Sequence, residues 1–288
     1  MPLFRLLEDF LGAKIWVSNI IAVTICAILS FLIANLNSIH LIINERTFIP
    51  ALIFIFIIAI LPQYQVLNPV LPASVFMIFA IKKILESYNK KGVAYNFFDA
   101  GILIGIGSLF YANLIWFGTL IFIGIFLLRS INIKEIVISI IGLITPYLIM
   151  FGLYYLLGYD LNELLSLIYN NLFTKAVSFS FSKLNTVALI FISAIAVFSL
   201  GQILMLQNTT IISRKAFSLL IWMFFVAIGV CFFVPSASLE MIWIIGMPLS
   251  YFIAHFFIFL KRKILSEIIF NLFFLIILLI QVLHIFGR

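Results

Sequence analysis

Charge is scarce in this sequence: 9% of its 288 residues are Asp, Glu, Lys or Arg, while 65% are hydrophobic. The mean hydropathy of +1.31 lies far above that of water-soluble domains. Because a membrane-spanning helix needs about 20 apolar residues, ten such helices take roughly 200 positions and leave only short connections. The composition excludes a cytosolic enzyme, a nucleic-acid-binding protein and a separate soluble domain.

Residues that bind metals or form disulfides are almost as rare. Cys26 and Cys231 each lie in an apolar run, where a cysteine is typically a small buried hydrophobic residue. The histidines His40, His255 and His284 are scattered, and no zinc-protease, nucleophile-elbow, phosphate-loop or dinucleotide motif is present. The sequence therefore predicts no metal and no cofactor. For His255, a hydrogen-bonded structural role is favoured over a catalytic one.

Long apolar runs are abundant, and polar residues separate them. They predict an all-α fold: one integral-membrane domain, residues 1–288, built as a polytopic transmembrane bundle of about ten helices. The predicted helices are Ile15–Asn35, Thr47–Leu61, Pro69–Leu85, Phe97–Asn113, Leu114–Leu128, Glu135–Leu157, Thr186–Leu206, Ala216–Val234, Leu239–Leu260 and Ser266–Phe286. The second, third and fifth are short for a full crossing, which leaves open a re-entrant or strongly tilted segment.

Two further segments have the spacing of short amphipathic helices at the membrane surface. The first lies in residues 1–14, and the second lies in the long connection of residues 158–185, where Asp160 and Glu163 stand in capping-box-like spacing. The apolar faces predicted for them are Leu3, Leu7, Phe10 and Leu11 in the first, and Leu161, Leu164, Leu165, Ile168 and Leu172 in the second.

The cations fall mainly in four connections that are an even number of helices apart. These hold Lys82, Lys83, Lys90 and Lys91; Arg129 and Lys134; Arg214 and Lys215; and Lys261, Arg262 and Lys263. The positive-inside rule places all four in the cytoplasm and residues 158–185 outside. Ten full crossings put both termini outside, whereas a re-entrant Thr47–Leu61 puts the N-terminus inside. We choose the outer location.

Several carboxylates stand near predicted helix starts. Asp99 is predicted to cap its helix, and a first-turn position that complements the helix dipole explains Glu135, Glu240 and Glu267. Gly101 and Gly105 form a GxxxG pair, which predicts close helix packing better than ligand binding.

One distributed pattern is more specific than any local motif. The stretch IPALIFIFIIAILPQYQVLNPVLPASVFMIFAIKKILES, followed by FFDAGILIGIGSLFY, resembles an uncharacterised family of bacterial polytopic membrane proteins. It is also distantly similar to the membrane core of the GT-C glycosyltransferases, which use polyprenyl-phosphate sugars. The counterparts are Leu61-Pro62, Lys82-Lys83, Ala100 to Gly107, Val234-Pro235-Ser236 and Met247 to Tyr251. The resemblance covers roughly residues 45–130 and 215–260 and favours ten crossings in a bacterial inner membrane.

The chain also departs from that superfamily. It lacks the long first outer loop that carries the catalytic acid, and Glu8 and Asp9 are the carboxylates nearest to the equivalent place. Cations expected after the glycine-containing helix and before the late proline helix are replaced by Tyr111, Ala112 and Asn113 and by Ser236, Ser238 and Glu240. The resemblance therefore implies a divergent or inactive relative.

Two main functions follow as expectations. In the first, the protein transfers a sugar from a polyprenyl-phosphate carrier in an envelope pathway. Glu8 or Asp9 then acts as catalytic base, and Lys175 or Lys183 neutralises the phosphate near Asp160 and Glu163. In the second, the chain is a non-enzymatic scaffold for an envelope membrane protein, with lipid as its other partner. A transporter is less favoured because no internal repeat is visible.

Overall fold

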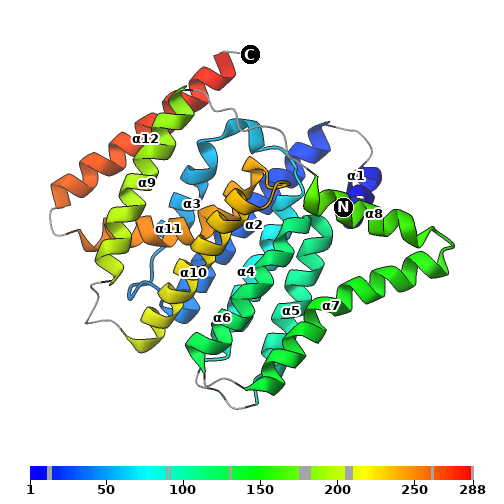
Figure 1. The fold of residues 1–288 in the computed structure, drawn as a ribbon. Coiled ribbons are helices and arrows are strands. Elements are labelled where there is room, and N and C mark those ends of the chain that lie inside the picture. Colours follow the sequence, from blue (N-terminus) through cyan, green and yellow to red (C-terminus); the bar gives the residue numbers. More distant parts are fainter. Residues whose placement is uncertain are drawn as a thin grey trace.

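The computed structural model describes residues 1–11, 15–88, 90, 92–129, 132–174, 183–204, 210–260 and 263–286. Within these ranges all regular structure is helical, which confirms the predicted all-α class (Figure 1). The α-helices are α1 (Pro2–Leu11), α2 (Ile15–His40), α3 (Ile49–Ala59), α4 (Val70–Glu86), α5 (Ala94–Phe110), α6 (Thr119–Leu128), α7 (Ile133–Leu156), α8 (Leu161–Phe173), α9 (Lys183–Leu204), α10 (Ile211–Phe233), α11 (Ile242–Phe259) and α12 (Lys263–Phe286). The 3₁₀ helices are η1 (Pro62–Tyr64), η2 (Ala112–Gly118) and η3 (Leu239–Met241).

Each predicted apolar run contains a helix, but several boundaries were wrong. Helix α2 runs five residues past Asn35, to His40, and the Ser38 hydroxyl in this extension donates a hydrogen bond to the carbonyl of Ala34 at 3.0 Å, so that this polar side chain is satisfied within the helix. It ends at Leu41, whose φ of 46° no longer fits a right-handed helix. The run Leu114–Leu128 starts as the 3₁₀ helix η2, so that α6 has 10 residues.

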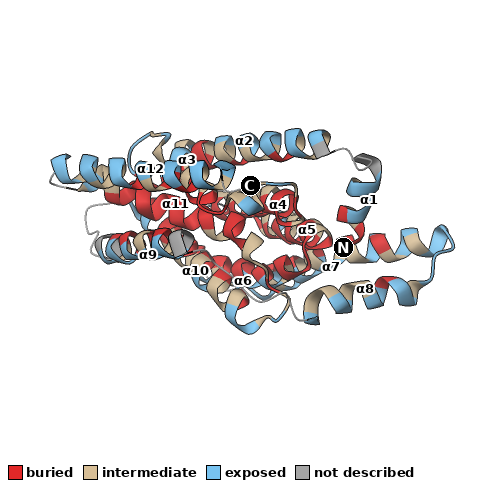
Figure 2. Cartoon of the chain, turned by 90° about the horizontal axis from the view of Figure 1, so that it is seen from above, coloured by how far each residue is buried: buried red, intermediate tan, exposed pale blue. Residues whose placement is uncertain are grey.

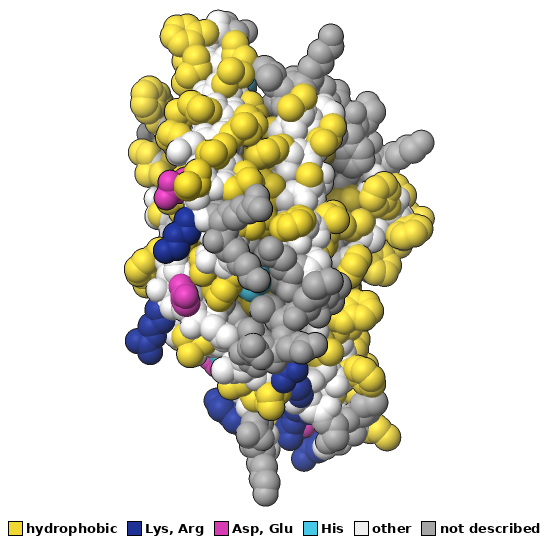
Figure 3. Space-filling model, turned by 90° about the vertical axis from the view of Figure 1, so that its left-hand side faces the viewer, with side chains coloured by type: hydrophobic (Ala, Val, Ile, Leu, Met, Phe, Trp, Pro, Cys, Tyr) yellow, Lys and Arg dark blue, Asp and Glu magenta, His cyan; other side chains and the backbone are white. Residues whose placement is uncertain are grey.

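Five helical segments are long and apolar enough to cross a membrane: Trp16–His40, Ile133–Leu156, Ile211–Phe233, Leu239–Phe259 and Lys263–Phe286. Buried residues concentrate in α4, α5 and α11, while exposed residues follow α2, α8 and α12 (Figure 2). Much of that exposed surface is apolar, and apolar side chains are spread from the upper to the lower end of the face in Figure 3. Such a surface is costly in water and suited to lipid. The chain is a membrane protein, as its composition predicts.

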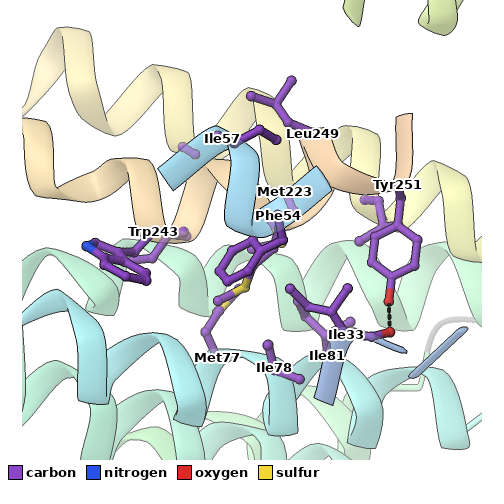
Figure 4. Close-up of a cluster of buried hydrophobic side chains, with 14 of the residues drawn as sticks. Ile33, Phe54, Ile57, Met77, Ile78, Ile81, Met223, Trp243, Leu249 and Tyr251 are labelled. Carbon is purple, nitrogen blue, oxygen red and sulfur yellow. Dashed lines mark hydrogen bonds between the residues drawn. The ribbon is translucent and has the colours of Figure 1, made fainter. Parts of the chain in front are cut away.

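Helix α11 lies at the centre of the core. Fourteen of its 18 residues are buried, as expected for a helix that is hydrophobic all round. Phe54 of α3 packs edge-on against Trp243, and the Tyr251 hydroxyl donates to the carbonyl of Ile33 in α2 at 2.6 Å (Figure 4). Gln281 of α12 donates to the carbonyl of Ala59 at 2.6 Å, which satisfies the end of the short helix α3. Polar side chains thus fix α2, α3, α11 and α12 together.

Helices α5 and α7 pack closely through three glycines, which confirms the packing role predicted for Gly101 and Gly105. A Cβ atom added to Gly101 would lie 2.6 Å from the carbonyl oxygen of Ser139, and one added to Gly105 would lie 2.7 Å from that of Leu143. Gly142 of α7 lies equally close to the backbone of α5. Residues later in α5 lie beside residues later in α7, so the two helices run parallel.

One end of the assembly holds most of the paired charges, and we call it the basic end. Arg129, after α6, lies 2.7 Å from Glu135 at the start of α7. Lys215, near the start of α10, lies 5.1 Å from the ring centre of Tyr88, which follows α4. Lys83 reaches from α4 to the first half of α5. On the face in Figure 3, the Lys and Arg side chains gather toward the lower end. Three of the four cation-rich connections therefore meet there; Lys261 and Arg262 of the fourth lie outside the described residues.

The cap predicted for Asp99 was wrong. Helix α5 begins three residues earlier than predicted, at Ala94, and its N-terminal flanking residue Val93 makes no side-chain capping bond. Asp99 therefore lies beyond the first turn and accepts a hydrogen bond from Lys83 at 2.8 Å. It joins α4 to α5 instead of ending a helix.

The opposite end, here the far end, holds the connections that follow α3, α5, α8 and α10. Trp243 donates to the carbonyl of Tyr64 at 3.3 Å, and Ser236 lies 2.8 Å from the carbonyl of Leu172 at the end of α8. Leu3 of α1 packs against a small apolar cluster formed by α5, α7 and α8. Helices α1 and α8 thus both lie beside the ends of longer helices, as surface helices do.

The amphipathic faces are only partly as predicted. In α8, Leu164 is buried and Leu161, Ile168 and Leu172 are half-buried, but Leu165 is exposed. In α1, Leu3 and Leu7 are half-buried, and the side chains of Phe10 and Leu11 lie outside the described residues. Asp160 caps α8 by accepting from the Asn162 amide at 2.9 Å, so the predicted start of this helix is confirmed.

Candidate functional site

Helix α5 ends at the far end in a way that turns polar side chains inward. Tyr111 has extended backbone angles, φ −132° and ψ 105°, and the chain then resumes as η2. Asn113, in the first turn of η2, is only 1% exposed. Because this change of direction follows directly on the helix, both side chains face the protein interior and not the lipid.

The connection between α10 and α11 meets them from the other side. Pro235 cannot continue α10, since it lacks an amide proton. The amide of Ala237 then closes a turn on the carbonyl of Val234 at 3.1 Å, and Ser238 precedes η3. This turn brings Ser236, Ser238 and Glu240 toward η2.

The five side chains Tyr111, Asn113, Ser236, Ser238 and Glu240 form what we call the polar cluster. The Asn113 amide donates to the Tyr111 hydroxyl at 3.2 Å, and the Ser236 hydroxyl donates toward the Asn113 carbonyl oxygen at 2.9 Å. Ser238 lies near the Tyr111 hydroxyl and directs its own hydroxyl at Glu240 Oε2, 3.4 Å away. A bonded network thus joins the ends of α5 and α10 across more than 100 residues of sequence.

The charge of the polar cluster is unbalanced. Glu240 is half-buried, and among the described residues no Lys, Arg or His nitrogen lies within 4.0 Å of its carboxylate. By contrast, Glu86, Asp99 and Glu135, near the basic end, each have a cation within that distance. The polar cluster can accept hydrogen bonds from a ligand, but its described side chains offer no positive charge to an anion.

Two apolar grooves lie on opposite sides of the last turn of α10, and Ser238 of the polar cluster lines one of them. The α8 groove has a volume of about 500 Å³, and the α9 groove has a volume of about 340 Å³. Residues that line the α8 groove include Trp116, Leu172, Gly229, Val230, Val234 and Pro235. Residues that line the α9 groove include Leu61, Ile192, Cys231, Phe232, Ser238 and Leu239. The connection between α10 and α11 therefore borders both grooves, with Pro235 lining the α8 groove and Ser238 lining the α9 groove.

None of the predicted site residues belongs to the polar cluster as the structure describes it. Glu8 and Asp9 are exposed on α1, and Asp160 and Glu163 are exposed at the start of α8. The start of α8 is about 18 Å from Leu172, at 1.5 Å per residue, so it is remote from the polar cluster. Lys175 lies outside the described residues, as does the side chain of Lys183.

Sequence analysis missed the polar cluster because it treated Glu240 only as a first-turn residue. A signal was nevertheless present. Tyr111 and Asn113, and likewise Ser236, Ser238 and Glu240, stand at the two places where the resemblance to glycosyltransferase cores implies cations, and the predicted topology puts both places on one side of the membrane. Considering the two places together would have predicted a shared site.

His255 is a second correction. The ring is 2% exposed and lies edge-on to Phe217 and tilted against Phe259, with ring centres 5.4 Å and 4.6 Å away. Neither ring nitrogen has a hydrogen-bond partner among the described residues, so the predicted hydrogen-bonded role was wrong. Across the described ranges, no three His, Cys, Asp or Glu side chains are grouped as metal ligands.

Comparison with known protein families identifies the family of this chain. A family model matches residues 3–286. The chain belongs to DUF6427, a family of unknown function. The match with DUF6427 runs from α1 to the end of α12, so it includes the polar cluster and both grooves. No curated protein and no solved structure matches the chain.

Proposed function

We propose that this DUF6427 protein is a multi-pass protein of the bacterial inner membrane that holds a lipid at its outer end. The observation that carries the proposal is the position of two apolar grooves on either side of the α10–α11 connection, which also supplies Ser236, Ser238 and Glu240 to the polar cluster. Grooves of this size and lining suit hydrocarbon chains, and a few convergent polar groups fix a ligand's orientation. A lipid has both the hydrocarbon chains that such grooves bind and a polar head group that such polar side chains orient.

The orientation of the protein rests on its charges. The positive-inside rule assigns the basic end to the cytoplasm, which leaves the far end with its polar cluster outside. Helix α1 packs near the far end, and this supports an outer N-terminus and ten crossings. Helix α3 has 11 residues and spans about 16 Å, so its crossing relies on the apolar residues on either side.

Cysteine labelling tests this topology. Lys90 and Asn170 are both exposed and belong to opposite ends of the protein. After Cys26 and Cys231 are replaced by Ser, Asn170→Cys should react with a membrane-impermeant maleimide in intact cells, and Lys90→Cys should react only after the membrane is opened. Labelling of Lys90→Cys from outside would reverse the orientation.

The expected polyprenyl-phosphate carrier is one lipid that the grooves would fit. Sugar transfer needs in addition a base at the reacting hydroxyl and a cation at the phosphate. Glu8 and Asp9 lie on α1 and not in the polar cluster, and Lys175 and Lys183 remain candidate cations on sequence grounds alone. We therefore propose lipid binding. This activity is compatible both with a divergent glycosyltransferase and with an assembly subunit of an envelope pathway.

Filling one groove tests lipid binding. A Cβ atom on Gly229 would meet nothing within 4 Å, so Gly229→Leu should fold normally and fill part of the α8 groove. Displacing about three methylenes at about 0.8 kcal/mol each should weaken lipid binding by more than tenfold. The measurement is native mass spectrometry of the protein released from mild detergent, in which the wild type should retain lipid that Gly229→Leu loses.

Gly152→Leu is the matched control. Gly152 also has nothing within 4 Å of its added Cβ and does not line the α8 groove. This variant should retain lipid as the wild type does. If Gly229→Leu retains as much lipid as Gly152→Leu, the α8 groove is not a lipid site and the proposed function is wrong.

A further inference from the structure

The proposed lipid site has an unusual charge for a membrane surface. Glu240 is half-buried beside apolar grooves, where an uncompensated carboxylate is unfavourable unless a ligand or water satisfies it. No described cation reaches it within 4.0 Å. The carboxylates near the basic end show the usual arrangement, since Asp99 and Glu135 bind Lys83 and Arg129 at 2.8 Å and 2.7 Å.

The other members of the polar cluster do not replace the missing cation. Asn113 donates to Tyr111, Ser236 donates to Asn113 or to the carbonyl of Leu172, and Ser238 donates toward Glu240. Most donor groups of the polar cluster are therefore engaged within it, while the carboxylate keeps free acceptor positions. A phosphate at this place would meet a like charge and few free donors.

We infer that the bound lipid carries a primary ammonium in its head group and that this ammonium binds Glu240. The inference rests on the proposed lipid-binding function. An ammonium has three N–H donors and a positive charge, and it therefore supplies both properties that the polar cluster lacks. The apolar α9 groove, which Ser238 and both chain neighbours of Glu240 line, and the α8 groove across α10 take the chains, which assigns the ammonium to a lipid and not to a soluble amine.

Tryptophan quenching by brominated lipids tests the inference. Trp116 lines the α8 groove, and Phe232, which is 83% exposed in the α9 groove, can be replaced by Trp as a second reporter. A Trp116→Phe variant gives the background from the remaining tryptophans. Vesicles of phosphatidylcholine contain equal fractions of brominated phosphatidylethanolamine, phosphatidylglycerol or phosphatidylcholine.

The three head groups differ in positive charge and in hydrogen-bond donors, the two properties that the inference concerns. Phosphatidylethanolamine has an ammonium with N–H donors, phosphatidylcholine has a cation without them, and phosphatidylglycerol has hydroxyl donors without a cation. We expect phosphatidylethanolamine to be favoured about fivefold over phosphatidylglycerol, as for a single partly exposed ion pair. Glu240→Gln should bring that ratio to about one, because the amide removes the charge. Glu86→Gln, a carboxylate near the basic end, should leave the ratio unchanged.

The outcomes distinguish the inference from the proposed function. If no lipid quenches Trp116 or Phe232→Trp beyond random mixing, and Gly229→Leu changes nothing, lipid binding itself is wrong. If lipid binds but phosphatidylglycerol or phosphatidylcholine is preferred, or Glu240→Gln keeps the preference, lipid binding stands and the ammonium inference is wrong. Competition by millimolar glycerophosphoethanolamine would instead assign the site to a soluble amine.

Discussion

Gly142→Leu should prevent α5 and α7 from packing together and should strongly destabilise the protein. An added Cβ atom at Gly142 would collide with the carbonyl oxygen of Phe98 and lie 3.1 Å from two further backbone atoms of that residue. Backbone atoms inside a helix cannot move aside as a flexible side chain does, so the helices must separate. Overpacking of this kind costs about 1–3 kcal/mol or more.

The measurement is the thermal midpoint of the detergent-solubilised protein, followed by size-exclusion chromatography after heating. A loss of about 3 kcal/mol corresponds to a fall of about 6–12 °C for a soluble chain of 150–250 residues, and we use that range as a guide here. Gly152→Leu, in the same helix with open space around the added atom, is the control and should keep the wild-type midpoint. Equal midpoints for the two variants would show that α5 and α7 do not approach each other as described.

This packing was predictable because it depends on a local pattern. Gly101 and Gly105 stand four residues apart on one face of an apolar helix, and small residues at that spacing let two helices approach closely. The apolar runs predicted helices for the same reason, since the composition of each run is enough to indicate one. What the pattern could not supply was the partner: nothing in the glycine spacing of α5 points to Gly142 in α7.

Residues whose role depends on an exact helix start were harder to predict. Asp99 is a plausible cap for a helix that begins at Phe97, but α5 begins at Ala94, and three residues change the neighbour of Asp99 from a backbone amide to Lys83. Helix ends are set by tertiary contacts as much as by local preference. Asp160 was predicted correctly because its cap uses only the next two residues of the chain.

The candidate site was the least predictable part for a related reason. Asn113 and Ser236 bond across 123 residues of sequence, and polar residues at two separate helix ends carry no periodic signal. The candidates Glu8, Asp9, Asp160 and Glu163 were chosen because they are charged and near a predicted surface, yet in the structure all four are exposed. The residues that converge are mostly uncharged, and only the fold brings them to Glu240.

Arg129→Gln should also cause a large loss of stability, because it removes the only cation paired with a buried carboxylate in the described part of the chain. Glu135 is 5% exposed and accepts a hydrogen bond from Arg129 at 2.7 Å, while its second carboxylate oxygen has no partner there. Breaking a buried ion pair by removing one member costs about 3–5 kcal/mol, since the other charge stays buried without compensation. The loss is measurable as earlier unfolding when mixed micelles are titrated with sodium dodecyl sulfate.

A double variant separates the charge from other effects of the exchange. Arg129→Gln combined with Glu135→Gln removes both charges and should recover most of the lost stability, because no unpaired charge then remains buried. Lys82→Gln is the matched control: Lys82 lies 4.0 Å from Glu86 with both side chains about 30% exposed, and such pairs contribute about 0–1 kcal/mol. If Lys82→Gln and Arg129→Gln destabilise equally, or the double variant is no more stable than Arg129→Gln, Glu135 does not depend on Arg129 for its charge.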